Sequence, residues 1–169
     1  YNFDTATLTS VSAYDHLYRY AAEDADGFPQ IIVDDLYENT IKQYSQELRL
    51  TSNTKGALHW VLGGLLSQDE INTPRQEFLG TDFPVPGGLN AIYVQKTRAA
   101  AVFAHADWSL DDKIQLVGGL RYTNERRRFD GRTIATITGN TIGVPGVPYT
   151  PDIILASNDS SRTFSDLSW

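Results

Sequence analysis

The chain has 169 residues with a formal net charge of −7, and it contains neither cysteine nor methionine. The absence of cysteine excludes disulfides and thiolate metal ligands, and the acidic balance argues against a nucleic-acid partner, which normally faces a basic stripe. No apolar run reaches the length of about 18 residues that a transmembrane helix needs. The chain begins in a polar-aromatic stretch and ends inside a predicted strand, so we expect it to be a piece of a longer protein.

Alternation of apolar and polar residues predicts strands along most of the chain, with almost no helical periodicity. In residues 44–52, Leu48 and Leu50 lie on one face and Glu47 and Arg49 on the other, with Gln46 as an exception. The first candidate strand is extended, but its two faces are not assigned. The candidate strands cover residues 5–20, 44–52, 57–67, 99–109, 114–125 and 162–169. The pattern predicts an all-β, antiparallel meander of about six strands.

The connections between these strands alternate in length. "NTKG" and "DDK" are tight, turn-rich links, whereas the links at about 21–41, 69–95 and 126–161 are long. A compact soluble domain seldom carries structureless loops of that length. A transmembrane β-barrel combines short periplasmic turns with long extracellular loops, so we predict part of such a barrel.

Strand register gives an internal check on the two predicted hairpins. Pairing Leu110 with Ile114 places a set of apolar residues opposite one another, and a slip of one residue would mix the two faces. The pairs predicted to share the apolar face are Trp108 and Leu116, Ala106 and Gly118, Ala104 and Leu120, Val102 and Tyr122, Leu50 and Leu58, and Leu48 and Trp60. A β-sandwich core would give the same agreement, so this check supports a sheet without placing it in a membrane.

Aromatic residues lie at both ends of the predicted apolar face. Trp60 and Trp108 are near the short turns, where the inner aromatic girdle of a membrane barrel lies. Tyr122 lies farther toward a long loop, and Tyr18 and Tyr20 are candidates for the outer girdle. Aromatic residues in a sandwich core would look similar.

Several segments together resemble the barrel of TonB-dependent outer-membrane receptors, in the order in which that family has them. They are "LTSVSAY" (8–14), "QELRLTS" (46–52), "HWVLGGLL" (59–66), "AAVFAHADWSLDDKIQLVGGLRYTNERR" (100–127) and "FSDLSW" (164–169). The resemblance implies that residues 1–169 are part of a barrel of about 22 strands with a plugged lumen. The plug and the segment that engages TonB are absent from this sequence.

The same resemblance implies a function without a catalytic step. Such a receptor lies in the outer membrane of a Gram-negative bacterium and uses energy transmitted by TonB to take up a large, scarce nutrient, most often a ferric siderophore. No intrinsic cofactor is implied. In agreement, the sequence shows no nucleophile–base pair, phosphate loop or zinc signature. Its partners would be the TonB complex, outer-membrane lipid and lipopolysaccharide, and a small-molecule ligand, with no nucleic acid.

Candidate functional residues fall into two groups. Those predicted to face the lumen and contact the plug are Glu47, Arg49, His59, His105, Arg121 and Glu125. Without cysteine or a spaced third ligand, the histidines do not predict a metal site. The outer-loop candidates for ligand contact are Arg126, Arg127, Arg128 and Tyr149. The three arginines have alternative interpretations: a solvated charge run balanced by Glu125 and Asp130, or a contact with lipopolysaccharide phosphates.

Two other classes of protein remain open at this point. A passive porin or adhesin barrel would share the strand pattern but lack the TonB-engaging segment. A soluble β-sandwich, such as a carbohydrate-binding module, would fold without detergent.

Overall fold

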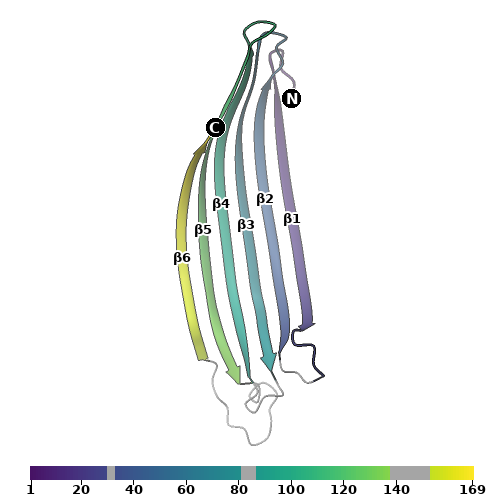
Figure 1. Ribbon diagram of the computed structural model, residues 1–169, viewed down its shortest axis with the longest axis vertical. Helices are drawn as coiled ribbons and strands as arrows, with labels where there is room; N and C mark the ends of the chain where they lie inside the picture. The colour runs from purple at the N-terminus through teal and green to yellow at the C-terminus, as the bar shows by residue number, and fades with distance from the viewer. Residues whose placement is uncertain (30–32, 81–86, 138–152) are drawn as a thin grey trace, which may run out of the picture.

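The structure, a computed structural model, describes residues 1–29, 33–80, 87–137 and 153–169. These residues form one antiparallel sheet in which each strand pairs with the next along the chain (Figure 1). The strands are β1 (Ala6–Asp24), β2 (Asp34–Ser52), β3 (Leu58–Gly80), β4 (Gly87–Ser109), β5 (Gln115–Ile137) and β6 (Ile153–Ser168). The predicted all-β meander is confirmed. None of the described residues forms a helix of the length and apolar character needed to cross a membrane.

The strands continue far into the segments that the sequence predicted as long loops. Most of ranges 21–41 and 69–95, and much of 126–161, is paired strand, which leaves residues 25–33, 81–86 and 138–152 between the strands. The predicted extent of the loops is therefore wrong. Polar residues occupy both faces in these outer parts, so the sequence lacks the alternation that reveals a strand. The backbone ladder holds them together all the same, because its hydrogen bonds do not depend on side-chain polarity.

The predicted register is confirmed for β4 and β5, where Trp108 faces Leu116 and Val102 faces Tyr122. Between β2 and β3 the shared face is confirmed, but the pairing differs. Leu50 lies opposite Leu62, and Leu48 opposite Gly64, because the connection is wider than a tight turn. Its first residue, Asn53, instead donates its backbone N–H to the carbonyl of Thr5 at 2.9 Å.

One face of the sheet carries a mainly apolar surface, which we call the apolar band; Ser10, Ser12 and Gln46 interrupt it, and both serines hydrogen-bond with Gln46. It runs from Trp60 and Trp108 near the short turns to Tyr14, Tyr44 and Tyr122. The ladder thus assigns β1, whose facing the sequence left open. Leu66 and Val102 are about 60% exposed within this band, at 60% and 62%.

The apolar band is uncovered in the described part of the chain. There, the buried apolar residues are Ala6 and Ala101 alone, and the strands form a single layer without a second sheet against it. This arrangement contradicts the alternative of a β-sandwich, since a sandwich buries its apolar residues between two sheets.

The opposite face, which we call the polar face, is the more crowded one. Asn39, Thr73 and Ala101 are buried there although no other described element packs on the sheet. The strands bend along their length (Figure 1), and a curved sheet crowds the side chains on its concave side. We conclude that the polar face is concave and the apolar band convex.

Glycines on the polar face lie directly beneath bulky side chains of the neighbouring strand. A methyl group at Gly63 would overlap the ring of its partner Phe103, and one at Gly119 would lie 3.0 Å from Nδ1 of its partner His105. An aromatic ring that covers a cross-strand glycine stabilises a curved sheet. Gly118, which faces the apolar side, has no such neighbour within 4 Å. The glycine pair in β5 is therefore asymmetric, with only Gly119 needed for close packing.

A bulge in β3 interrupts the ladder beyond the apolar band. The pairing with β2 shifts between Glu38 and Thr40, and the pairing with β4 shifts between Thr73 and Glu77. Both shifts fall around Pro74, which has no backbone N–H to contribute. Bulges are among the few places where a strand accommodates proline, so Pro74 accounts for both irregularities.

The uncovered apolar band predicts how the isolated 169-residue chain behaves. Without detergent it should show no sharp thermal unfolding transition, because both edge strands lack partners and the apolar band faces water. Circular dichroism during heating tests this expectation. A cooperative transition in detergent-free buffer would contradict the membrane orientation of the sheet.

The contrast between Gly63 and Gly118 predicts a second result, measured in the full-length barrel refolded in detergent. Gly63→Ala should lower the free energy of unfolding by about 1–3 kcal/mol, because the Phe103 ring must move away. Gly118→Ala is the matched control and should leave stability nearly unchanged. Urea midpoints that shift equally for both variants would refute the packing argument.

Candidate functional site

Charged side chains form a belt across the polar face, behind the apolar band. On β2, Arg49 donates from Nε to Glu47 at 2.9 Å, and on β5 Arg127 pairs with Glu125. Arg121 donates to a threonine hydroxyl on its own strand instead. The ladder puts every residue predicted to face the lumen on this one face: Glu47, Arg49, His59, His105, Arg121 and Glu125.

The two strand histidines do not form a metal centre with each other. His59 lies opposite Asp107, and His105 Nε2 is 3.3 Å from the Asp107 carboxylate. No group of three or more His, Cys, Asp or Glu side chains suited to a metal ion occurs among the described residues. Asp107 therefore lies within ion-pairing distance of His105, a common arrangement of polar side chains on a strand.

The three consecutive arginines lie inside β5 and not in a loop, which corrects their predicted placement. Because side chains alternate along a strand, Arg127 points to the polar face while Arg126 and Arg128 point to the opposite one. Arg127 also lies over the ring of Phe164, with its guanidinium carbon 5.6 Å from the ring centre. Tyr149, the remaining loop candidate, lies outside the described residues.

Farther from the short turns, the polar face carries a set of side chains that we call the aromatic row: Arg19, Tyr37, Tyr93 and Phe129. The Arg19 guanidinium carbon lies 5.1 Å from the centre of the Tyr37 ring. The Tyr37 and Tyr93 side chains lie near each other across β3 on the polar face. Tyr93 in turn stacks on Phe129, with ring centres 5.6 Å apart and 25° between the planes. The row therefore extends from β1 to β5 across the polar face.

Two polar side chains are buried within this row. The Asn39 amide donates to the Tyr37 hydroxyl at 2.9 Å, while Thr73 is fully buried at 0% exposure on β3, between the strands of Tyr37 and Tyr93. Asn39 Oδ1 and Thr73 Oγ1 are buried without a hydrogen-bond partner in the described part of the chain. An unpaired buried oxygen costs free energy of about 1–3 kcal/mol, which a donor from outside this chain would recover.

Burial raises the pKa of the Tyr37 hydroxyl above its ordinary value, and the neighbouring Tyr93 raises it further. The Arg19 guanidinium acts in the opposite direction but has a smaller effect. Tyr37 lies beyond the apolar band, so water reaches this part of the sheet. A tyrosine is protonated at neutral pH even with an ordinary pKa, so Tyr37 is a neutral donor and acceptor there.

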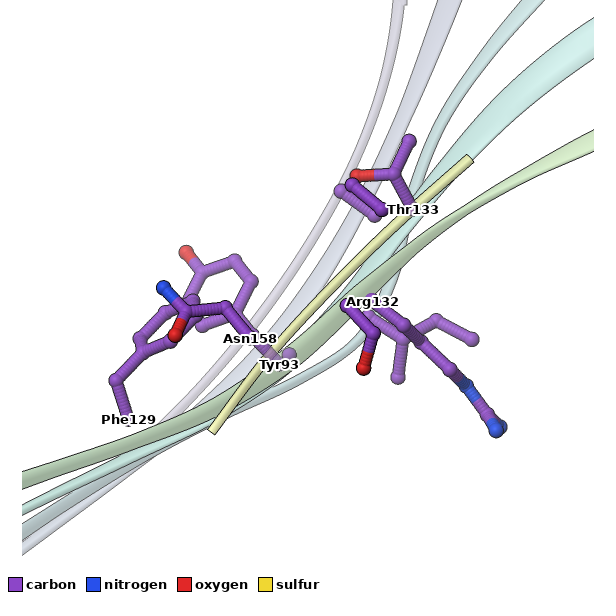
Figure 2. A pocket seen from close by; sticks show the side chains of 10 residues that line it. Tyr93, Phe129, Arg132, Thr133 and Asn158 are labelled. Atoms are coloured by element: carbon purple, nitrogen blue, oxygen red, sulfur yellow. The ribbon is translucent and has the colours of Figure 1, made fainter. Parts of the chain in front are cut away.

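A shallow pocket opens beside the Tyr93–Phe129 stack. Figure 2 shows Tyr93, Phe129 and Asn158 on one side of the sheet and Arg132 on the other. Gly131 lies under the stack, where a Cβ would be 2.8 Å from the Phe129 ring. Glycine is therefore needed for the two rings to lie against the sheet.

The sequence missed the aromatic row because its members lie where we predicted loops, apart from Arg19, whose facing was unassigned. One signal was present: Tyr93, Gln95 and Thr97 keep a period of two that leads into the predicted strand at residue 99. Extending that period backwards would have put Tyr93 on the face of His105. The contact between Tyr37 and Tyr93 spans three strands, and no local pattern encodes it.

The side chains of the row are of kinds that form non-covalent contacts. Aromatic faces stack on planar or apolar groups, a guanidinium attracts anions, and the amide and phenol exchange hydrogen bonds. The arrangement suits recognition of a rigid ligand with an anionic part.

Comparisons with known proteins agree with this geometry. The family model described as "TonB dependent receptor-like, beta-barrel" matches residues 1–169. The crystal structure of the ferric yersiniabactin uptake receptor FyuA from Yersinia pestis is similar over 99% of this chain, with a TM-score of 0.67 and 16% sequence identity. The chain spans 23% of that receptor chain, and at this identity the likeness supports the fold alone. No curated protein matches the sequence.

Proposed function

Because the chain belongs to the TonB-dependent receptor family, as six strands of its β-barrel, we propose that the parent protein actively imports a large ligand across an outer membrane. In this proposal the apolar band faces lipid and the polar face lines the lumen. The segment itself forms wall and binding surface and performs no catalytic step.

The distribution of unsatisfied groups carries the proposal. Within the described ranges, the buried side-chain oxygens without partners belong to Asp35, Asn39, Asp69 and Thr73. All of them lie on the polar face. Lipid offers no hydrogen-bond donors, so this face needs a polar occupant. A plug domain near the short turns and a ligand beyond the apolar band would supply the hydrogen-bond donors.

The charged side chains of the polar face, which we call the charge belt (Glu47, Arg49, Arg121, Glu125 and Arg127), are the proposed contact surface for the plug. Glu47 and Glu125 are already paired with arginines of their own strands, which leaves Arg121 with a neutral partner. We propose that Arg121, together with His59 and His105, forms hydrogen bonds with a plug domain in the parent. The energy for import would come from TonB through a segment outside this sequence.

The aromatic row suits the ligand. It lies beyond the apolar band, where an extracellular ligand arrives first, and it combines stacking surfaces with the Arg19 guanidinium. A ferric siderophore has rigid chelating groups and often a net negative charge, so it fits these contacts. The similarity to a ferric yersiniabactin uptake receptor is compatible with this ligand class and does not extend to the individual siderophore.

Removal of the stack tests the ligand role in the parent receptor. Tyr93→Ala combined with Phe129→Ala should weaken binding of the transported ferric siderophore on the order of tenfold, since aromatic contacts of this kind contribute about 0.5–1.5 kcal/mol each. Titration of the purified receptor by tryptophan fluorescence measures the change. The matched control, Tyr14→Ala with Tyr20→Ala, removes two exposed rings from the opposite face and should bind normally. Equal losses in both variants would reject the aromatic row as the binding surface.

Energy dependence separates import from passive diffusion. In cells without TonB, uptake of radiolabelled iron by the parent receptor should fall to background while surface binding of the ferric siderophore persists. The reason is that binding needs only the barrel, whereas release into the periplasm needs the plug to move. Uptake that continues without TonB would favour the passive porin.

A further inference from the structure

A cluster of basic side chains lies on the apolar face, immediately beyond the apolar band. We call Lys96, Arg98, Arg126 and Arg128 the basic cluster. They occupy two adjacent rows of the ladder between β4 and β5: Arg98 lies opposite Arg126, and Lys96 lies opposite Arg128. All four side chains are exposed.

This placement of like charges is unfavourable within the sheet alone. Directly opposed like charges destabilise a strand pair, and the cluster forms in a chain whose net charge is −7. The outer row has partial compensation, because Lys96 Nζ is 3.0 Å from Glu70 and an Arg128 amino group is 3.2 Å from Asp159.

The inner row lacks such compensation. Arg98 donates to the neutral Gln68 side chain at 3.1 Å, and Arg126 donates to the Ser161 hydroxyl at 3.2 Å. Neither guanidinium forms an ion pair with an acidic residue of the described chain. Two adjacent guanidinium groups with neutral partners therefore point away from the barrel lumen, where an external anion reaches them.

An apolar groove of about 410 Å³ begins one row nearer the membrane. Gly64 and Ala100 form its floor because they are small, while Leu66, Val102 and Tyr122 rise beside them. Ala100 lies two residues along β4 from Arg98, a rise of about 7 Å. The groove thus ends at the inner row of the basic cluster.

We propose that the basic cluster and this groove together bind a phosphorylated lipid of the outer leaflet, with head-group phosphates on Arg98 and Arg126 and an acyl chain in the groove. Guanidinium groups bind phosphate oxygens in a bidentate manner and tolerate partial dehydration. The apolar groove selects a lipid over free phosphate, since it adds contacts only for a ligand with a hydrocarbon chain. The inference rests on the proposed function, because it requires the apolar band to face a bilayer.

The test uses the full-length receptor purified in a neutral detergent. Binding of a diphosphorylated glycolipid is measured by native mass spectrometry, beside its dephosphorylated form and inorganic phosphate. Three variants are compared: Arg98→Gln with Arg126→Gln, Gly64→Leu to fill the groove, and Arg127→Gln with Arg162→Gln. The last is the matched control, because Arg127 and Arg162 are also directly opposed but lie on the polar face.

We expect the Arg98→Gln, Arg126→Gln variant to bind the phosphorylated lipid about 30-fold more weakly, since each basic residue at a membrane surface contributes a factor of about five. Gly64→Leu should weaken lipid binding without changing the response to inorganic phosphate, and the control should bind as the unmodified receptor does. Inorganic phosphate that competes as well as the lipid would overturn the lipid assignment. So would equal losses in the control and the Arg98→Gln, Arg126→Gln variant.

Cell fractionation keeps the two proposals separable. A receptor that reaches the outer membrane but binds phosphorylated and dephosphorylated lipid equally would refute the basic cluster alone. A receptor that is soluble without detergent would refute the membrane orientation as well.

Discussion

The register of the antiparallel ladder is the constraint on which the other features of this sheet depend. Strand side chains alternate between faces with a period of two, so a slip of one residue would exchange the apolar band and the charge belt. The pairing of Trp108 with Leu116 and of Phe103 with Arg121 fixes this assignment for β4 and β5. The pairing of each strand with its neighbour extends this assignment across the sheet, and the pairing of β1 with β2 determines which side chains of β1 lie on each face.

Local exceptions to regular pairing shape the polar face around the aromatic row. The bulge at Pro74 occurs where Asn39 and Thr73 become buried beneath the aromatic row. Bulges re-aim side chains next to functional sites. Gly131 acts in a similar way, because its missing side chain lets the Tyr93–Phe129 stack lie on the sheet. The bulge at Pro74 and the glycine at position 131 both change how side chains of the polar face pack around the aromatic row.

The two faces of the same strands differ in polarity: one is mainly apolar and the other is polar and charged. On one face, the apolar band is followed along β4 and β5 by the basic cluster, whose cations lie opposite one another. This change is expected at a boundary between hydrocarbon and charged head groups. On the other face, carboxylates and guanidinium groups pair along the strand, and buried side-chain oxygens of four described residues have no hydrogen-bond partner.

The amino-acid sequence by itself determined the strands, their order and their two faces wherever one face is apolar, because alternation is then visible. It also placed Glu47, Arg49 and Arg121 on a common polar face. The tertiary structure alone decided the length of the strands beyond the apolar band, where both faces are polar and alternation disappears. It also decided the split of Arg126, Arg127 and Arg128 between two faces and the contact of Tyr37 with Tyr93. These depend on cross-strand pairing between residues far apart in the chain, which no local pattern records.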